Sequence, residues 1–167
     1  GLEGTESLLV DPTLLADHGQ NACSISYYSP SWDGKYMLYG IAENGAENTQ
    51  VYVIKIDSGA IIDGPISRAY YFGGCWLPDN QSFFYTRFQE MKEGMDSNEK
   101  HLNSKAYLHR LGTAIETDEI VLGYGVSDLV SAPAVIPSVS IGPDSDYVLA
   151  LLFNGTQKEL ELHATSF

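Results

Sequence analysis

A short phrase occurs three times in this chain, and the repeat restricts the possible folds more than any other feature. The copies begin at Trp32-Asp33-Gly34, Pro78-Asp79-Asn80 and Pro143-Asp144-Ser145, and each continues into an aromatic and aliphatic run. Aspartate with glycine or asparagine is typical of the two-residue turn of a β-hairpin, because these residues tolerate positive φ. The apolar run after each turn predicts a strand that is buried on both faces.

The spacing of the copies is that of β-propeller blades. Asp33 and Asp79 are 46 positions apart, close to the roughly 40–50 residues of a four-stranded blade. Asp79 and Asp144 are 65 positions apart, which is longer than one blade. We attribute the extra length to residues 90–105. They are polar and charged without β periodicity, so we expect them to form a loop inserted in the second blade. The repeat alone leaves open a β-sandwich in which hairpins recur by chance.

The expected fold is all-β, a partial β-propeller of about two and three-quarter blades of four-stranded antiparallel sheet. Residues 1–20 are a lead-in, 21–68 the first blade, 69–127 the second, and 128–167 an incomplete third. The expected strands are residues 23–29, 36–42, 51–56, 61–66, 71–77, 82–88, 106–111, 119–124, 135–141, 147–153 and 159–164. A further strand is possible at residues 8–10. Residues 90–100 are the one stretch with a pattern compatible with a turn or two of helix.

Composition limits the class of partner. The 167 residues are 44% apolar and 19% charged, which predicts a globular rather than a disordered chain. The chain has 9 Lys and Arg residues and 22 Asp and Glu residues, which gives a formal net charge of −13. This balance argues against nucleic acid and against an anionic membrane surface as partners. No run resembles a signal peptide or is long enough to span a membrane, and the cytoplasm is favoured over the periplasm or secretion.

The sequence offers no candidate metal or cofactor site. Cys23 and Cys75 stand in apolar strand-like contexts, which favours buried free thiols over a disulfide. No pair of His or Cys has the spacing of zinc ligands, and no glycine-rich phosphate loop is present. Asp144-Ser145-Asp146 lacks the ligand count of a calcium loop and is interpreted as a turn. The N-glycosylation sequons at Asn80 and Asn154 are also interpreted as hairpin turns.

No catalytic residue is expected in this chain. The nucleophile elbow Gly-x-Ser-x-Gly occurs nowhere in the sequence. None of the four histidines, His18, His101, His109 and His163, has the sequence context of a general base. His109 stands in a strand-like phrase, which favours a structural role.

Several spaced motifs resemble the opening propeller of the prolyl oligopeptidase family. They are Leu8-Leu9-Val10-Asp11-Pro12, Tyr28-Ser29-Pro30-Ser31-Trp32-Asp33-Gly34, Val51-Tyr52-Val53, Asp57-Ser58-Gly59, Trp76-Leu77-Pro78-Asp79, Phe83-Phe84-Tyr85-Thr86-Arg87 and Tyr107-Leu108-His109-Arg110-Leu111-Gly112-Thr113. They follow the order of the family and cover nearly the whole chain. The oligopeptidase B group shares a phrase like His109-Arg110-Leu111-Gly112-Thr113, but the opening motif favours the prolyl group.

The resemblance implies that the complete enzyme is a two-domain serine peptidase. An α/β-hydrolase domain would carry a Ser-Asp-His triad, and a seven-bladed propeller would cap it and restrict access to short peptides cleaved after proline. This chain would be a non-catalytic part of that propeller, with the catalytic domain of the parent chain as its partner and oligopeptides as the substrates of the full enzyme. The alternative is a free-standing β-rich protein-interaction module without a catalytic domain.

The resemblance also implies two substrate-proximal residues in the full enzyme. Alignment on Trp76 places Tyr71 where the family usually has a phenylalanine near the substrate entrance. A shift of one residue would put Phe72 at that position instead. We therefore expect Tyr71 or Phe72 to lie near the substrate, and the residues themselves leave core packing between blades as the alternative.

An incomplete propeller is expected to expose surfaces that a closed ring would cover. The faces of the first and last blades should be apolar, and a third blade without its fourth strand has an unpaired edge. We therefore expect self-association of the chain, because salt screens the repulsion between acidic surfaces beyond about 8 Å.

Overall fold

A computed structural model describes residues 3–14, 22–46, 48–70, 73–155 and 157–167. The strands are β1 (Cys23–Pro30), β2 (Tyr36–Glu43), β3 (Asn48–Lys55), β4 (Ala60–Tyr70), β5 (Cys75–Trp76), β6 (Ser82–Arg87), β7 (Lys105–Arg110), β8 (Glu119–Gly123), β9 (Val135–Ile141), β10 (Tyr147–Asn154) and β11 (Leu160–Ser166). Three short 3-10 turns, η1 (Pro12–Leu14), η2 (Ser97–His101) and η3 (Ile115–Thr117), complete the described elements. No described helix is long or apolar enough to cross a membrane.

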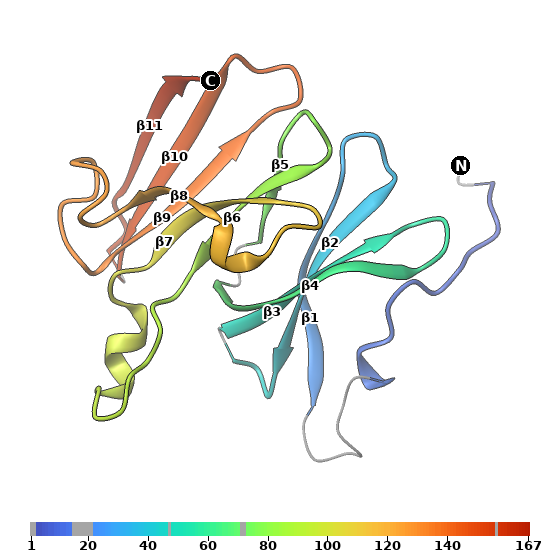
Figure 1. The fold of residues 1–167 in the computed structure, drawn as a ribbon, viewed down its shortest axis with the longest axis horizontal. Coiled ribbons are helices and arrows are strands. Elements are labelled where there is room, and N and C mark those ends of the chain that lie inside the picture. The colour runs from blue at the N-terminus through green and yellow to red at the C-terminus, as the bar shows by residue number, and fades with distance from the viewer. Residues whose placement is uncertain (1–2, 15–21, 47, 71–72, 156) are drawn as a thin grey trace.

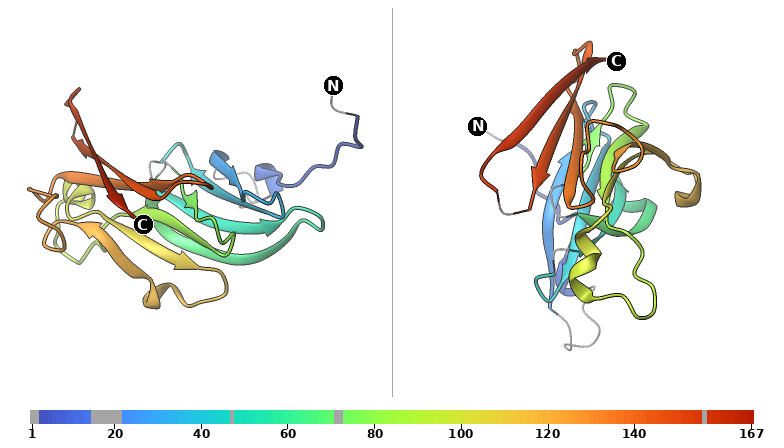
Figure 2. Two further views of the ribbon diagram at one scale, coloured as in Figure 1. Left: turned by 90° about the horizontal axis from the view of Figure 1, so that it is seen from above. Right: turned by 90° about the vertical axis from the view of Figure 1, so that its left-hand side faces the viewer.

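The strands form consecutive antiparallel groups that fan out across the molecule (Figures 1 and 2). We name β1–β4 the first blade, β5–β8 the second and β9–β11 the third. The strands of each blade are paired in chain order. The first two blades also meet at one backbone pair, Ala69 of β4 with Arg87 of β6. This arrangement confirms the all-β propeller architecture expected from the repeat.

Apolar side chains pack in the two spaces between neighbouring blades. Leu38, Val51 and Ile66 of the first blade pack against Trp76 and Phe83 of the second. Between the second and third blades, the buried residues are Leu77, Phe84, Ala106, Leu122, Val130, Val135, Val139, Ile141 and Leu152. The second blade is covered on both faces, because it lies between two neighbours. This position explains the continuous burial of β6, which the apolar run after Asp79 predicted.

The repeated turns of the first two blades are connected to each other. Gly34 and Asn80 have φ values of +70° and +54°, as the Asp-Gly and Asp-Asn pairs predicted. The backbone N–H of Asp33 donates to Oδ1 of Asn80 at 3.0 Å, and Nε1 of Trp32 donates to the carbonyl of Trp76 at 3.0 Å. The repeat therefore supplies both the hairpins and a polar contact between neighbouring blades.

The turns differ in length from the two-residue hairpin loops that the sequence predicted. In the first blade, residues 31–35 separate β1 from β2, and the Ser31 N–H donates to the carbonyl of Tyr36 at 2.8 Å. The Asp33 carboxylate accepts from the Ser31 hydroxyl at 2.8 Å and from the Lys35 N–H at 3.1 Å. These side-chain bonds stabilise the longer loop, so the expected two-residue turn was wrong.

All eleven strands occur near their expected positions, and other predictions are corrected. Residues 8–10 form no strand; Leu9 and Val10 instead pack against Tyr39, Ile41 and Ile54 on the far face of the first blade. The strand expected at residues 71–77 is described only as the two-residue β5. Pairing with β3 and then β6 extends β4 through Tyr70, which local propensity did not reveal.

The third copy of the phrase differs from the first two in burial. In β10, Val148 and Leu152 pack toward the second blade, whereas Tyr147 and Leu149 are 58% and 38% exposed. The expectation of burial on both faces therefore fails for this strand. The reason is tertiary, because the described residues cover only one face of the third blade.

The segment between β6 and β7 runs outside the sheets, as its polar composition predicted. The predicted end of this segment, at residue 105, was too late. Lys105 already belongs to β7, where it pairs with Arg87 of β6. The expected helical turn forms at η2, where Asp96 and Glu99 make a capping box. η2 begins seven residues after the start of the expected range of 90–100 and ends one residue beyond it.

We predict that trypsin cleaves first after Lys92. Lys92 lies beside exposed Met91 and two residues before Gly94, whose φ is +87°, and the segment carries no sheet pairing. The comparison sites are Lys35, in a hydrogen-bonded turn, and Lys55, at the end of β3. Mass spectrometry of a time course identifies the first cut, and Lys92→Gln should delay it. First cleavage after Lys35 or Lys55, or strong hydrogen-exchange protection of residues 90–96, would contradict this prediction.

Candidate functional site

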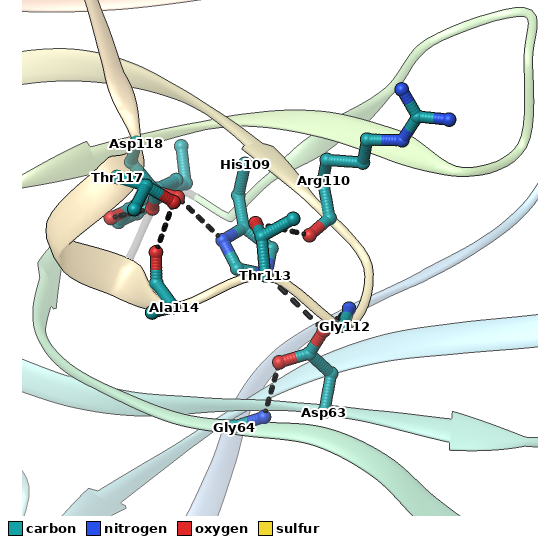
Figure 3. A network of polar contacts seen from close by, with 10 residues as sticks. Asp63, Gly64, His109, Arg110, Gly112, Thr113, Ala114, Thr117 and Asp118 are labelled. Atoms are coloured by element: carbon teal, nitrogen blue, oxygen red, sulfur yellow. Dashed lines mark hydrogen bonds and ion pairs between the residues drawn. The ribbon is translucent and has the colours of Figure 1, made fainter.

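A group of polar side chains surrounds His109, the next-to-last residue of β7. The His109 side chain is 0% exposed and its ring lies 5.1 Å from that of Phe83. Its Nδ1 is 2.8 Å from Oδ1 of Asp118, and its Nε2 is 3.2 Å from Oδ2 of Asp63 (Figure 3). Asp118 follows η3, whereas Asp63 belongs to β4. The imidazole therefore connects the second blade to the first.

Both carboxylates have further hydrogen-bond donors. Asp63 accepts from the backbone N–H groups of Gly64 at 2.7 Å and Gly112 at 2.6 Å. Oδ2 of Asp118 accepts from the hydroxyl of Tyr85 at 2.8 Å. An ionised carboxylate can only accept hydrogen bonds. If both carboxylates are ionised, both ring nitrogens of His109 donate, and the geometry fits an imidazolium between two carboxylates.

The pKa of His109 is the result of opposing effects. Burial lowers the pKa, whereas hydrogen bonds and charge interactions with Asp118 and Asp63 raise it, and the net direction is upward. Burial is also the main cause of the raised pKa of Tyr85, which keeps its hydroxyl protonated and donating to Asp118. The network is thus arranged to hold one positive charge on His109.

We predict that the stability supplied by His109 declines as the pH rises. The ordinary pKa of histidine in an unfolded chain is about 6.5, and the folded value is higher. The stabilisation is therefore complete below the unfolded pKa and is lost as the pH passes through the folded pKa. Urea unfolding from pH 5.5 to 9 should show a shrinking difference between the wild type and His109→Leu. A difference that is constant or grows with pH would contradict a folded-state imidazolium.

The network contains no group suited to nucleophilic catalysis. The nearby Thr113 and Thr117 hydroxyls donate to the carbonyls of Arg110 and Ala114, at 2.7 and 2.6 Å (Figure 3). An activated nucleophile would need a hydroxyl or thiol directed at the base, but both nitrogens of His109 face carboxylates. The arrangement therefore favours the structural role that the sequence predicted for His109.

The second blade and the third enclose an apolar groove of about 460 Å³. Phe84, Leu108 and Val121 line one wall, and Val148 and Ala150 of β10 line the other. The final residues of β11 border its opening. Its walls continue the apolar contact between these blades, so the groove is interpreted as a gap in blade packing.

The other residues that the sequence analysis singled out are Tyr71, Phe72 and the two cysteines. Tyr71 and Phe72 lie outside the described residues, so their proposed nearness to substrate stays a prediction. Cys23 and Cys75 are free thiols, as expected, but both are only half-buried. Burial raises the pKa of the Cys75 thiol, which lies 3.3 Å from the carbonyl of Ile141. No group of three or more His, Cys, Asp or Glu among the described residues could hold a metal ion.

Sequence reasoning found His109 but not its partners. Asp63 is 46 positions before His109, and its neighbourhood follows from the packing of one blade on the next. Asp118 lies five positions after the family-like phrase that ends at Thr113. The signal that could have found the network was an aspartate inside an apolar strand, because buried carboxylates need a partner.

Comparisons with known proteins agree with the propeller architecture. A model of the prolyl oligopeptidase N-terminal beta-propeller domain matches residues 1–165. A prolyl oligopeptidase of Omphalotus olearius is 28% identical over 153 residues, which is 85% of this chain and 20% of that protein. A prolyl endopeptidase of Elizabethkingia miricola is 27% identical over 120 residues, or 72% of this chain and 17% of that protein.

A solved structure supports the same assignment at the level of fold. Prolyl oligopeptidase B from Galerina marginata, bound to a 35mer hydrolysis and macrocyclization substrate, superposes with a TM-score of 0.78 at 21% identity. The match covers 94% of this chain and 22% of that one. The chain thus spans about a fifth of the length of its relatives. On this evidence the chain belongs to the prolyl oligopeptidase family and corresponds to its N-terminal β-propeller.

Proposed function

We propose that this chain is a non-catalytic propeller segment of a serine peptidase that cleaves peptides after proline. In the full-length protein, the propeller would cap an α/β-hydrolase domain and restrict access to its active site. The chain would supply a lead-in at residues 1–20, blades at 21–68 and 69–127, and most of a third blade at 128–167. Its partners would be the catalytic domain and the oligopeptide substrate.

The observation that carries this proposal is the match of residues 1–165 to the propeller domain of prolyl oligopeptidases. The names of the relatives, prolyl oligopeptidase and prolyl endopeptidase, supply the proposed specificity. The buried and fully bonded His109 is consistent with a catalytic centre that lies elsewhere in the protein. Access of peptides as long as the 35mer bound by the Galerina marginata protein would be compatible with a cap that excludes folded proteins.

Tyr71 and Phe72 are the proposed contacts of this chain with substrate. They would occupy the connection between β4 and β5, where the family resemblance places an aromatic residue near the entrance. In the full-length protein, Tyr71→Ala and Phe72→Ala should each be compared with Tyr28→Ala, because Tyr28 is an aromatic residue 71% exposed on β1. A rise in KM confined to one of the two would identify the contact, and unchanged kinetics in both would reject it.

We predict that the isolated chain hydrolyses no proline-containing peptide, whereas the full-length protein does. The chain lacks the nucleophile elbow, so it has no group to form a covalent intermediate. The measurement is cleavage of a proline-containing hexapeptide and of an unfolded protein by both samples, with a serine-directed inhibitor as the control. Turnover by the purified isolated chain, or a full-length protein that cleaves neither peptide nor protein after proline, would contradict the proposal.

A further inference from the structure

Three cations lie on neighbouring strands at the contact between the first and second blades. Arg68 lies on β4, Arg87 on β6 and Lys105 on β7. Arg87 is paired with Ala69, next to Arg68, on one side and with Lys105 on the other. Residues directly opposite in an antiparallel pair share one face, and like charges in such a pair are unfavourable. The position of the three cations therefore needs an explanation beyond solubility.

The two guanidinium groups are held in place by the neighbouring strand. Nη1 of Arg68 donates to the carbonyl of Phe88 at 3.0 Å. Nε of Arg87 donates to the carbonyl of Ser67 at 3.0 Å, and its Nη2 lies 3.4 Å from the Ser67 hydroxyl. A guanidinium has five N–H donors, so both groups keep donors beyond these bonds. The arginines are thus fixed in orientation and still able to bind an acceptor.

Among the described residues, these three cations have no carboxylate partner, whereas Lys35 and Lys55 do. Lys35 and Lys55 each lie 3.0 Å from an aspartate oxygen, those of Asp33 and Asp57. Within the described ranges, Arg68, Arg87 and Lys105 form no ion pair, although acidic residues outnumber basic ones by 22 to 9. Burial and the charge of Arg87 lower the pKa of Arg68, and Glu90 opposes this only in part. An additional anion would relieve this repulsion.

We propose that Arg68, Arg87 and Lys105 form a binding site for a single carboxylate group presented by a peptide. Guanidinium groups match a carboxylate geometrically and bind it with two parallel hydrogen bonds. The net charge of −13 disfavours a run of acidic residues or another polyanion. The rings of Tyr70 and Phe88, next in sequence to Ala69 and Arg87, pack edge to face with centroids 5.0 Å apart, and Phe88 is buried. The inference does not depend on peptidase activity.

Two sources of the carboxylate can be distinguished with small probes. N-acetyl-Gly-Phe carries only a terminal carboxylate, and N-acetyl-aspartate amide carries only a side-chain carboxylate. Their matched controls are N-acetyl-Gly-Phe amide and N-acetyl-asparagine amide. Each probe is titrated into the ¹⁵N-labelled chain, and the Nε–H resonances of Arg68 and Arg87 are followed. We expect a saturable shift with at least one acid and none with its amide.

The variants Arg87→Gln and Lys105→Gln should weaken binding of the acid about tenfold or more, because each removes a charge-assisted contact. Lys105→Gln is the safer variant for folding, because no side-chain hydrogen bond of Lys105 is present among the described residues. Lys35→Gln, at a turn, is the control and should bind as the wild type does. Raising the salt concentration from 0.05 to 0.5 M should also weaken binding.

Some outcomes would overturn the inference. Shifts that are equal for acid and amide would mean that the peptide backbone or the aromatic ring, not the carboxylate, is bound. Absence of any saturable shift at the two arginines would mean that their side chains serve only to connect β4 and β6 through hydrogen bonds. Unchanged affinity in both Arg87→Gln and Lys105→Gln would place the binding elsewhere on the chain.

Discussion

Replacement of His109 by leucine is expected to lower the free energy of unfolding by about 3–5 kcal/mol, because it leaves buried carboxylates without their cation. The side chains of Asp118 and Asp63 are 1% and 10% exposed, so water cannot replace the imidazolium at Asp118 and has little access to Asp63. Leucine keeps the apolar contact with Phe83 but supplies no donor. Urea unfolding at pH 6, followed by tryptophan fluorescence at low protein concentration, measures the loss.

The matched control is His163→Leu, on β11. His163 also lies near a carboxylate, 3.3 Å from Glu161, but Glu161 is exposed and His163 is only partly buried. Exposed pairs contribute about 0–1 kcal/mol, so this variant should unfold close to the wild-type midpoint. A triple variant with His109→Leu, Asp63→Asn and Asp118→Asn should recover part of the loss, because it removes the unpaired charges. A loss below about 1 kcal/mol in His109→Leu alone would show that the network contributes little to stability.

The isolated chain is expected to self-associate through the third blade, and a charge on the blade face turned away from the second blade should weaken the association. Leu149 of β10 and Leu162 of β11 lie on the face turned away from the second blade, with Leu162 opposite Leu151 in the sheet. Leu162 is 65% exposed and Leu149 38%. Burial of a leucine side chain contributes about 1.5–3 kcal/mol. Light scattering over a dilution series should therefore give a mass above the 18.3 kDa of one chain.

Leu149→Glu and Leu162→Glu should each raise the dissociation constant by roughly tenfold or more, since a charge at the contact must be desolvated. Leu14→Glu is the control, because Leu14 is 81% exposed in η1 and outside this face. A strictly monomeric wild type at high concentration would mean that the face of the third blade turned away from the second stays exposed to water without causing association. Equal effects of all three substitutions would point to overall charge instead of this face.

The sequence by itself determined the strands and their grouping. Each copy of the phrase combines a turn with a strand, and both signals are local, so Gly34 and Asn80 could be assigned to positive φ without knowledge of the fold. The polar segment between β6 and β7 was equally evident, because it lacks alternation. The family-like phrases then fixed the kind of propeller to which these strands belong.

Other features depended on contacts between residues far apart in the chain. The ends of β4 were set by pairing with β3 and β6, not by its own residues. Leu9 and Val10 have the composition of a strand but pack as side chains against Tyr39, Ile41 and Ile54 of the first blade. β10 is exposed on one face because burial depends on the neighbouring blade.

The polar sites likewise depend in part on local sequence and in part on contacts between distant segments. The sequence indicated that His109 belongs to a strand and has no catalytic context. Only the packing of the first blade on the second brought Asp63 to its Nε2, and the same crossing set Arg68 beside Arg87. Local sequence fixes which backbone conformation a segment prefers, whereas burial, charge pairing and the pKa of a side chain depend on what the rest of the fold places around it.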